Sequence, residues 1–413
     1  MKVILSHPTG NEFVRAAALG LLNCNMLAEF WTTVATFPGN VFDLASKLTA
    51  FSEFERRRYN KVLEPFTRVL PWFELGRLAA SKASLNKIIQ HETGILSVDA
   101  IYRQLDKKVA KSLKKIDNNR VDAIYAYEDG AFFSFQKAKE LGMECFYDLP
   151  IGHWRAARRL METERERWPD WESTLIGFGD SDEKLARKDE ELQMADRIFV
   201  ASTFTANTLK EYPGKLASIE VIPYGFPPVY KTRQYLNLHG KPLKLLFVGG
   251  LSQRKGIADL FAVAGALHKY VELTIVGQKA VDNCPVLNEA LTKHRWIPSL
   301  AHTEILKLMR TSDILVFPSL FEGFGLVITE AMSQGTPVIT TERTAGSDLI
   351  KHGENGWLIN AGSTGALQAA IENILIKSGS IAEAGNMAVD TASRRPWEMY
   401  GIELAQAVLN HKR

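Results

Sequence analysis

The 413-residue chain lacks several features that would assign it to a common protein class. Its three cysteines, Cys24, Cys145 and Cys284, are too few and too widely spaced for a disulfide framework or a zinc cluster. No apolar run is long enough to span a bilayer, and Met1 leads straight into a predicted strand rather than a signal peptide. We therefore expect a protein of the reducing cytoplasm.

Charge and glycine patterns argue against two further classes. The net charge is +3, which is too small to indicate a nucleic-acid partner. No Gly-x-Gly-x-x-Gly sequence follows the first predicted strand, so a dinucleotide oxidoreductase is disfavoured. A hydrophobic content of 46% is ordinary for a soluble globular protein with a sizeable core.

Short β-branched runs alternate with helical stretches along the whole chain. This alternation is typical of parallel sheets with helices on both faces, and it predicts an α/β fold. The predicted strands are Lys2–His7, Asp122–Tyr127, Glu144–Leu149, Arg197–Ala201 and Glu220–Pro223 in the first half, and Leu243–Gly249, Glu272–Gly277, Asp313–Pro318, Pro337–Thr341 and Gly356–Ile359 in the second.

A stretch rich in proline and polar residues, Tyr224–Lys241, predicts a linker between two domains. We place the first domain at residues 1–225, the linker at 226–241, the second domain at 242–390 and a terminal segment at 391–413. The last helix is expected to begin near Arg395 and to run through Leu409.

Residues 43–116 are predicted to form a helical insertion in the first domain, without a convincing strand. Aromatic residues from Phe51 onward are interleaved with arginines, among them Arg56, Arg57 and Arg58. A basic and aromatic helical face suits peripheral docking on an anionic membrane. The alternative is an ordinary insertion whose aromatic residues are core and whose charges are solvated.

The most informative segment is 317–337, which carries two carboxylates, Glu322 and Glu330, around a glycine-rich bend. A buried strand precedes the bend and a helix is predicted to begin near Leu326, so Glu322 lies in a strand-to-helix turn. Eight helical positions would rise about 12 Å, a span that suits one ligand held at two points. The backbone amides of residues 323–325 would face an anionic part of that ligand.

A second glycine turn, in the segment 246–257, ends in the basic pair Arg254 and Lys255 just before a predicted helix. Departure of a nucleoside diphosphate builds up negative charge, which these two cations could neutralise without a metal. The competing interpretation is a basic pair on the surface at the start of a helix.

Both segments resemble the signature of family-4 glycosyltransferases, which are retaining enzymes of the GT-B fold. The resemblance implies two Rossmann-like, doubly wound domains facing a central cleft, with the terminal helix crossing back to brace the first domain. It implies transfer of a hexose from a nucleotide-diphosphate sugar, with a UDP-sugar favoured over a GDP-sugar, to a glycan, a lipid-linked or another hydroxyl acceptor. It implies no metal and no further cofactor.

The resemblance assigns roles residue by residue. Glu322 would contact the transferred sugar, Lys255 the leaving diphosphate, and Glu330 the ribose hydroxyls. His153, which follows a predicted strand, resembles the histidine of this family that lies beside the transferred sugar. The alternative is a histidine with a purely structural role. The remaining donor-binding candidates are Gly10, Arg254, Gly250, Ile297, Gly323, Phe324, Gly325 and Leu326.

Two other interpretations compete with a glycosyltransferase. One is a different enzyme on the same fold, such as a nucleotide-sugar epimerase or a phosphorylase, and the other is a binding subunit that has lost its chemistry. The combined presence of Lys255, Glu322 and Glu330 argues against the binding subunit. The acidic triplet at 180–182 is predicted to cap a helix and not to bind a metal, because a charged helix follows it.

Overall fold

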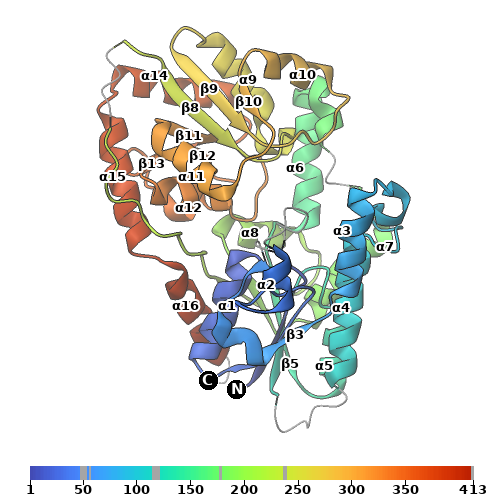
Figure 1. Ribbon diagram of the computed structural model, residues 1–413. Helices are drawn as coiled ribbons and strands as arrows, with labels where there is room; N and C mark the ends of the chain where they lie inside the picture. The colour runs from blue at the N-terminus through green and yellow to red at the C-terminus, as the bar shows by residue number, and fades with distance from the viewer. Residues whose placement is uncertain (47–53, 55–56, 114–120, 176–178, 236–239, 411–413) are drawn as a thin grey trace.

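The computed structural model describes residues 1–46, 54, 57–113, 121–175, 179–235 and 240–410. Within these residues the chain forms two sheets of parallel strands, one in each domain; in Figure 1 the sheet of the first half lies in the lower domain and the sheet of the second half in the upper domain. The first has the order β3-β2-β1-β4-β5-β6-β7 and the second the order β10-β9-β8-β11-β12-β13. The strands are β1 Val3–Ser6, β2 Leu27–Thr32, β3 Thr67–Val69, β4 Ala123–Tyr127, β5 Glu144–Leu149, β6 Arg197–Val200, β7 Ser218–Val221, β8 Leu243–Val248, β9 Val271–Val276, β10 Arg295–Ile297, β11 Ile314–Phe317, β12 Val338–Thr341 and β13 Gly356–Ile359.

Helices cover both sheets, as the alternation in the sequence predicts. The α-helices are α1 Glu12–Asn23, α2 Val41–Ser46, α3 Trp72–Lys82, α4 Val98–Leu113, α5 Phe132–Glu140, α6 Trp154–Arg167, α7 Asp182–Met194, α8 Thr203–Thr208, α9 Ile257–Ala266, α10 Pro285–Thr292, α11 His302–Thr311, α12 Leu326–Ser333, α13 Gly346–Leu349, α14 Thr364–Ile376, α15 Ser380–Ser393 and α16 Trp397–Leu409. None of the described helices has both the length and the apolar character needed to cross a bilayer. The predicted fold class, α/β with two doubly wound parallel sheets, is confirmed.

The prediction that residues 43–116 contain no strand is wrong. β3 lies inside this segment and pairs in parallel with β2, with Thr67 opposite Phe30. β3 has three residues and forms the edge of the sheet, where Arg68 and Val69 are exposed. β2, which was not predicted at all, interrupts its apolar run with Glu29. Short or mixed strands of this kind carry no clear periodicity.

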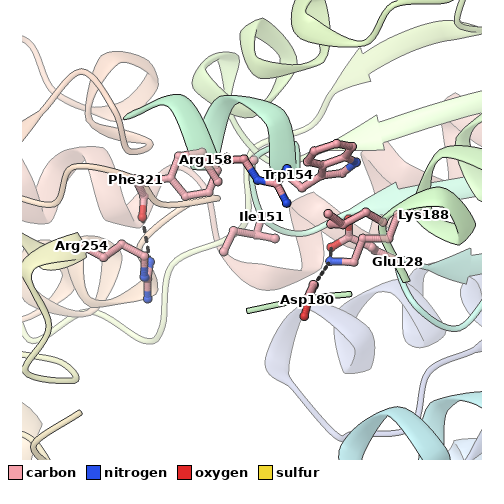
Figure 2. Close-up of a pocket in the computed structure, with 11 residues that line it drawn as sticks. Glu128, Ile151, Trp154, Arg158, Asp180, Lys188, Arg254 and Phe321 are labelled. Atoms are coloured by element: carbon pink, nitrogen blue, oxygen red, sulfur yellow. Dashed lines mark hydrogen bonds and ion pairs between the residues drawn. The ribbon is translucent and has the colours of Figure 1, made fainter. Parts of the chain in front are cut away.

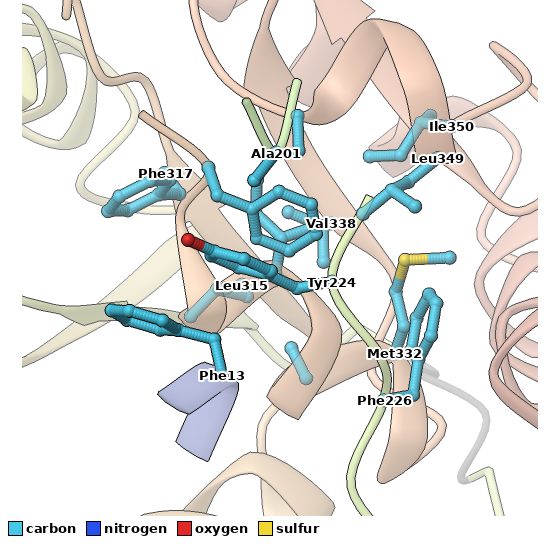
Figure 3. Packing of buried hydrophobic residues seen from close by; sticks show 14 of the residues in the cluster. Phe13, Ala201, Tyr224, Phe226, Leu315, Phe317, Met332, Val338, Leu349 and Ile350 are labelled. Carbon is cyan, nitrogen blue, oxygen red and sulfur yellow. The ribbon is translucent and has the colours of Figure 1, made fainter. Parts of the chain in front are cut away.

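The two domains share one apolar core at the start of the linker (Figure 3). The ring of Tyr224 stacks on Phe13 of α1 with the centroids 4.8 Å apart, and it also lies 4.8 Å from the ring of Phe324 in the second domain. Tyr224 further contacts Trp397 and Tyr400 of α16. One buried aromatic residue therefore joins the first domain, the second domain and the terminal helix.

The terminal helix α16 packs against α1 of the first domain. Gly20 and Gly401 let the two backbones approach so closely that a Cβ atom at Gly20 would collide with the Gly401 carbonyl. Arg197 of β6 donates a hydrogen bond to the carbonyl oxygen of Ala407. The chain therefore ends on the domain in which it begins.

One segment of the first half extends from its own domain to the second domain. Helix α6 rises beside α10, and the short 3-10 helix η4 (Pro169–Thr174) follows it there (Figure 1). The ring of Trp171 in η4 stacks on Phe261 of α9 with the centroids 5.8 Å apart. Packing therefore crosses the linker at a place that the sequence pattern does not reveal.

Candidate active site

The carboxyl ends of strands from both sheets face a cleft between the domains, which is where open α/β sheets bind ligands. A cavity of about 270 Å³ lies there, with walls from both domains (Figure 2). Its lining residues are Glu128, Ile151, Gly152, Trp154, Ala157, Arg158, Asp180, Leu185, Lys188, Arg254 and Phe321. Arg254 and Phe321 face the acidic and aromatic side chains of the first domain across the opening.

The basic pair predicted from the sequence lies on the second-domain side of this cleft. The short 3-10 helix η7 (Gln253–Lys255) carries it, and the Ser252 hydroxyl caps η7 by accepting a hydrogen bond from the Arg254 amide. The turn ends at Gly256, whose φ of 69° lies in the left-handed region that favours glycine. A side chain at Gly256 would also collide with the Pro318 carbonyl.

Glu322 is the partner of both cations. Lys255 Nζ forms an ion pair with Glu322 Oε2, and Arg254 Nη1 lies 3.2 Å from the same oxygen. Arg254 also donates to the carbonyl oxygen of Phe321 at 2.7 Å, and Lys255 Nζ lies 4.9 Å from the centre of the Phe317 ring. The structure therefore brings together three of the predicted site residues, contributed by two separate strand-to-helix loops.

The electrostatics of this cluster depend on Lys255, which is 9% exposed. Burial lowers the pKa of Lys255, and the neighbouring Arg254 guanidinium lowers it further. The Glu322 carboxylate, in direct contact, opposes both effects. A ligand that brings its own negative charge would stabilise the same two cations that Glu322 holds.

The glycine-rich loop after Phe321 is clamped between the two domains. The carbonyl oxygen of Gly323 accepts hydrogen bonds from the hydroxyls of Ser202 at 2.5 Å and Thr205 at 2.9 Å, both from the first domain. A Cβ atom at Gly323 would collide with the Pro150 carbonyl, so only glycine fits. Gly325, with a φ of 88°, then starts α12. This loop fixes Glu322 relative to the first domain.

Glu330 lies in α12, as predicted, and accepts a hydrogen bond from His302 Nε2 at 3.0 Å. This hydrogen bond is the main cause that raises the pKa of His302. Glu330 and Leu326 line a second cavity of about 300 Å³, together with Glu12, Pro227, Pro228, His302, Thr329 and Trp397. The two predicted carboxylates therefore lie in separate places: Glu330 lines this cavity, whereas Glu322 pairs with Arg254 and Lys255.

Three other donor-binding candidates occupy different places. Gly250 is exposed just after β8, and Ile297 ends β10, where its carbonyl oxygen accepts from the Gly277 amide at 3.0 Å. Gly10 is buried after β1, and a Cβ atom there would lie 2.9 Å from the Tyr59 hydroxyl. Gly10 borders a cavity of the first domain, and the lining of this cavity includes none of the residues of the Glu322 cluster.

His153 does not reach the cleft. It is 0% exposed and caps α6, where its Nδ1 accepts from the Arg155 amide. Its ring packs edge-on against Tyr212, and its Nε2 lies 3.4 Å from Asp189. Burial lowers the pKa of His153 to about 4. These contacts favour the structural alternative for His153 over contact with a transferred sugar.

The first-domain wall of the cleft contains residues that sequence reasoning missed. Glu128 follows β4 and is 9% exposed; burial raises its pKa to about 7, although Lys188 Nζ lies 3.5 Å away. Lys188 also pairs with Asp180 at 3.3 Å. The signal that could have identified Glu128 is its position directly after a buried strand. Trp154, at the start of α6, adds an aromatic face.

The acidic triplet caps a helix, as predicted. The Ser181 hydroxyl accepts from the Lys184 amide at 3.2 Å and begins α7. Among the described residues, His91, Glu92 and Asp180 form the one group of three side chains whose ligand atoms converge closely enough for a metal ion. His91 and Lys184 already pair with Asp180, at 2.9 and 3.1 Å.

Comparison with known proteins agrees with this geometry. Residues 230–389, which carry η7, Glu322 and Glu330, match the family described as glycosyl transferases group 1. This part of the chain is therefore similar to the group 1 glycosyltransferases. Over 277 residues it is 27% identical to a glycogen synthase of Mycobacterium tuberculosis, and the match covers 65% of each chain.

Other relatives and solved structures extend the comparison to the first domain. A D-inositol 3-phosphate glycosyltransferase of Paenarthrobacter aurescens is 26% identical over 326 residues, covering 71% of this chain and 76% of that protein. A sucrose-phosphate synthase from Thermosynechococcus elongatus superposes with a TM-score of 0.67 at 17% identity, covering 99% and 98% of the two chains. Anabaena HepE in complex with UDP gives a TM-score of 0.63 at 17% identity, covering 99% and 100%. The whole chain therefore shares their fold.

Proposed function

We propose that this chain is a retaining glycosyltransferase that moves a hexose from a nucleotide-diphosphate sugar to a hydroxyl group of a glycan, a glycolipid or another acceptor. The observation that carries the proposal is the convergence of Arg254, Lys255 and Glu322 at the cleft, within the group 1 domain. The relatives named above are a glycogen synthase and a D-inositol 3-phosphate glycosyltransferase, and their names support a glycosyltransferase as the class of enzyme.

The two cations supply what the departure of a nucleoside diphosphate requires. Negative charge develops on the leaving diphosphate, and fixed positive charges in a site screened from water stabilise it strongly. We propose that Arg254 and Lys255 do this without a required divalent metal. In that role the diphosphate replaces Glu322 as their partner, which frees the carboxylate to support the positive charge on the transferred sugar.

We further propose that the donor nucleotide extends from this cluster along the second domain. The ribose hydroxyls would bind Glu330, and the amides of the 323–325 loop would lie near the phosphates at the start of α12. Gly250 and Ile297, which follow or end strands of the same sheet, would border the nucleotide. A UDP-sugar is favoured over a GDP-sugar, and a structural neighbour that binds UDP supports this preference.

The acceptor would approach from the first-domain side of the cleft. Glu128 and Asp180 can accept hydrogen bonds from hydroxyl groups, Lys188 can donate them, and the face of Trp154 can stack on a sugar ring. These side chains lie opposite Arg254 across one cavity, so an acceptor hydroxyl there would be close to the leaving group.

We also propose peripheral contact with the cytoplasmic face of a membrane. The surface that makes this contact differs from the one expected from the sequence. Arg57 pairs with buried Glu74, and Arg58 pairs with Asp43, so these arginines hold the first domain together. Phe51 and Arg56 lie outside the described residues. Five of the exposed side chains of the segment are Lys61, Val62, Arg68, Val69 and Trp72, and we call this set the β3 edge patch. The acidic Glu64 is exposed beside it, and Arg68 pairs with Glu29. The apolar and basic character of the β3 edge patch supports contact with anionic lipid.

The proposal is tested by incubating the chain with UDP-glucose, UDP-galactose and GDP-mannose and measuring nucleotide release with and without oligosaccharide or lipid acceptors. We expect acceptor-dependent release that survives excess EDTA, and a product whose NMR coupling constants report the donor's anomeric configuration. Loss of turnover in EDTA or an inverted product would refute the mechanism. Interconversion of free UDP-sugars would favour an epimerase, and binding without release would favour a non-catalytic subunit.

A further inference from the structure

The turn that carries Arg254 and Lys255 is held from outside by residues of the first half of the chain. The Ser252 hydroxyl donates a hydrogen bond to the carbonyl oxygen of Thr174 at 2.6 Å. The Gln253 amide donates to the Thr174 hydroxyl at 2.9 Å. Thr174 ends η4, so the segment that crosses to the second domain contacts the turn directly before its two cations.

The side chain of Gln253 extends this contact. Its Nε2 donates to Glu164 Oε2 in α6 at 3.1 Å, and its Oε1 accepts from the Ala258 amide at the start of α9 at 2.9 Å. Gln253 is 0% exposed and Glu164 is 2% exposed. A buried amide whose donor and acceptor are both satisfied has one orientation, so it fixes the backbone that carries it.

Glu164 is itself held by charge. Arg167 Nη1 donates to both oxygens of Glu164, at 2.7 and 2.6 Å, and Arg167 Nη2 bonds to Asp259 at 2.5 Å. Thr364 donates to the same oxygen of Asp259. The result is a continuous polar network from α6 through the η7 turn to α9 and α14.

A simpler interpretation is that this network only joins the two domains. The apolar stack of Trp171 on Phe261 already does so. The polar bonds end on Ser252 and Gln253, and the Lys255 amide in turn donates to the carbonyl oxygen of Ser252 at 2.8 Å. The network therefore acts on the backbone of the cations.

We infer that Gln253, Thr174 and Glu164 are positioning residues that set Arg254 and Lys255 against the diphosphate of the donor. The inference rests on the proposed function, because it requires a diphosphate at the two cations. Displacement of a charged group by about 1 Å is enough to reduce catalysis about 100-fold, so the support of the turn is a determinant of rate. None of the three residues touches the substrate in this role.

The experiment compares diphosphate with monophosphate binding in the full-length chain. Affinities for UDP and UMP, and in parallel for GDP and GMP, are measured by calorimetry for the wild type, Gln253→Ala, Lys255→Ala and the double variant. We expect Gln253→Ala to weaken UDP about tenfold and to leave UMP nearly unchanged. The double variant should lose less UDP affinity than the product of the two single effects, because Gln253 acts partly through Lys255.

Two variants separate positioning from folding. Glu164→Gln keeps the size of the side chain and should reproduce the loss of diphosphate preference in weaker form. Thr364→Val breaks a bond at the far end of the same network and should leave the ratio of UDP to UMP affinity unchanged. Thermal unfolding of every variant checks that the fold persists.

The outcomes decide between the two claims. The positioning role is refuted if Gln253→Ala weakens the affinities for UDP and UMP equally, or if the loss of UDP affinity in the double variant equals the product of the two single losses. The proposed function stands in either case. If neither UDP nor GDP binds, or if Lys255→Ala leaves UDP binding unchanged, the proposed function itself fails.

Discussion

Replacing Lys255 by alanine is the most direct test of the proposed chemistry. Lys255 and Arg254 share one carboxylate, so Lys255→Ala leaves Glu322 paired with Arg254 at 3.2 Å. The free energy of unfolding should therefore fall by less than the about 3–5 kcal/mol that an uncompensated buried charge costs. We expect about 1–2 kcal/mol.

The effect on catalysis should be much larger. Loss of one fixed charge that meets the developing charge of the leaving group lowers kcat/KM by about 10²–10³, or about 2.7–4 kcal/mol of transition-state stabilisation. The assay follows nucleotide release at varied donor concentration, with unfolding in urea measured on the same preparations. Lys293→Ala, an exposed lysine paired with Glu289 in the same domain, is the matched control. Near-normal turnover of Lys255→Ala, or a loss matched by Lys293→Ala, would refute the role of Lys255.

Three further predictions follow from the geometry. Glu330→Gln should raise the Kd for the donor nucleotide about tenfold or more in calorimetry and change kcat less, whereas an unchanged Kd would remove Glu330 from the ribose site. Burial raises the pKa of Asp148 from 3.8 to about 7, so between these pH values the folded chain keeps a proton that the unfolded chain has lost. The free energy of unfolding is therefore highest below pH 3.8 with respect to this group, and it falls as the pH rises to about 7. Asp148→Asn, which keeps an acceptor for the Tyr125 hydroxyl, should reduce the loss of urea stability between pH 5 and 8 by about 2 kcal/mol; an unchanged pH profile would contradict this. Trp72→Ala combined with Lys61→Glu should reduce salt-sensitive co-sedimentation with anionic vesicles at unchanged thermal stability, and equal recovery with neutral vesicles would exclude the β3 edge patch as a docking surface.

The sequence was most informative where structure and chemistry are both local. The strand-turn-helix units around Lys255 and Glu322 could be predicted because their glycines, caps and apolar strands lie within about ten residues of each other. That the two units meet could be anticipated from the resemblance, but the shared oxygen of Glu322 could not.

What could not be predicted depends on partners far away in the chain. His153 looks like a cleft residue until Asp189 and Tyr212, dozens of residues later, enclose its ring. Arg57 looks like a surface charge until buried Glu74 pairs with it. No periodicity in residues 154–174 indicates that this segment packs on the other domain, because the contacts that join the two, such as Gln253 with Glu164 and Phe261 with Trp171, are long-range.

The crossing of α6 and η4 has a consequence for exchange of parts between relatives. A hybrid enzyme cut at the linker would keep the group 1 domain but receive foreign residues at Thr174 and Glu164 beneath its η7 turn. It would also place a foreign α1 under α16. Under the proposed function, donor and acceptor preferences are therefore not separable modules on the two sides of residue 230. A productive exchange has to move residues 154–174 together with the domain that they support.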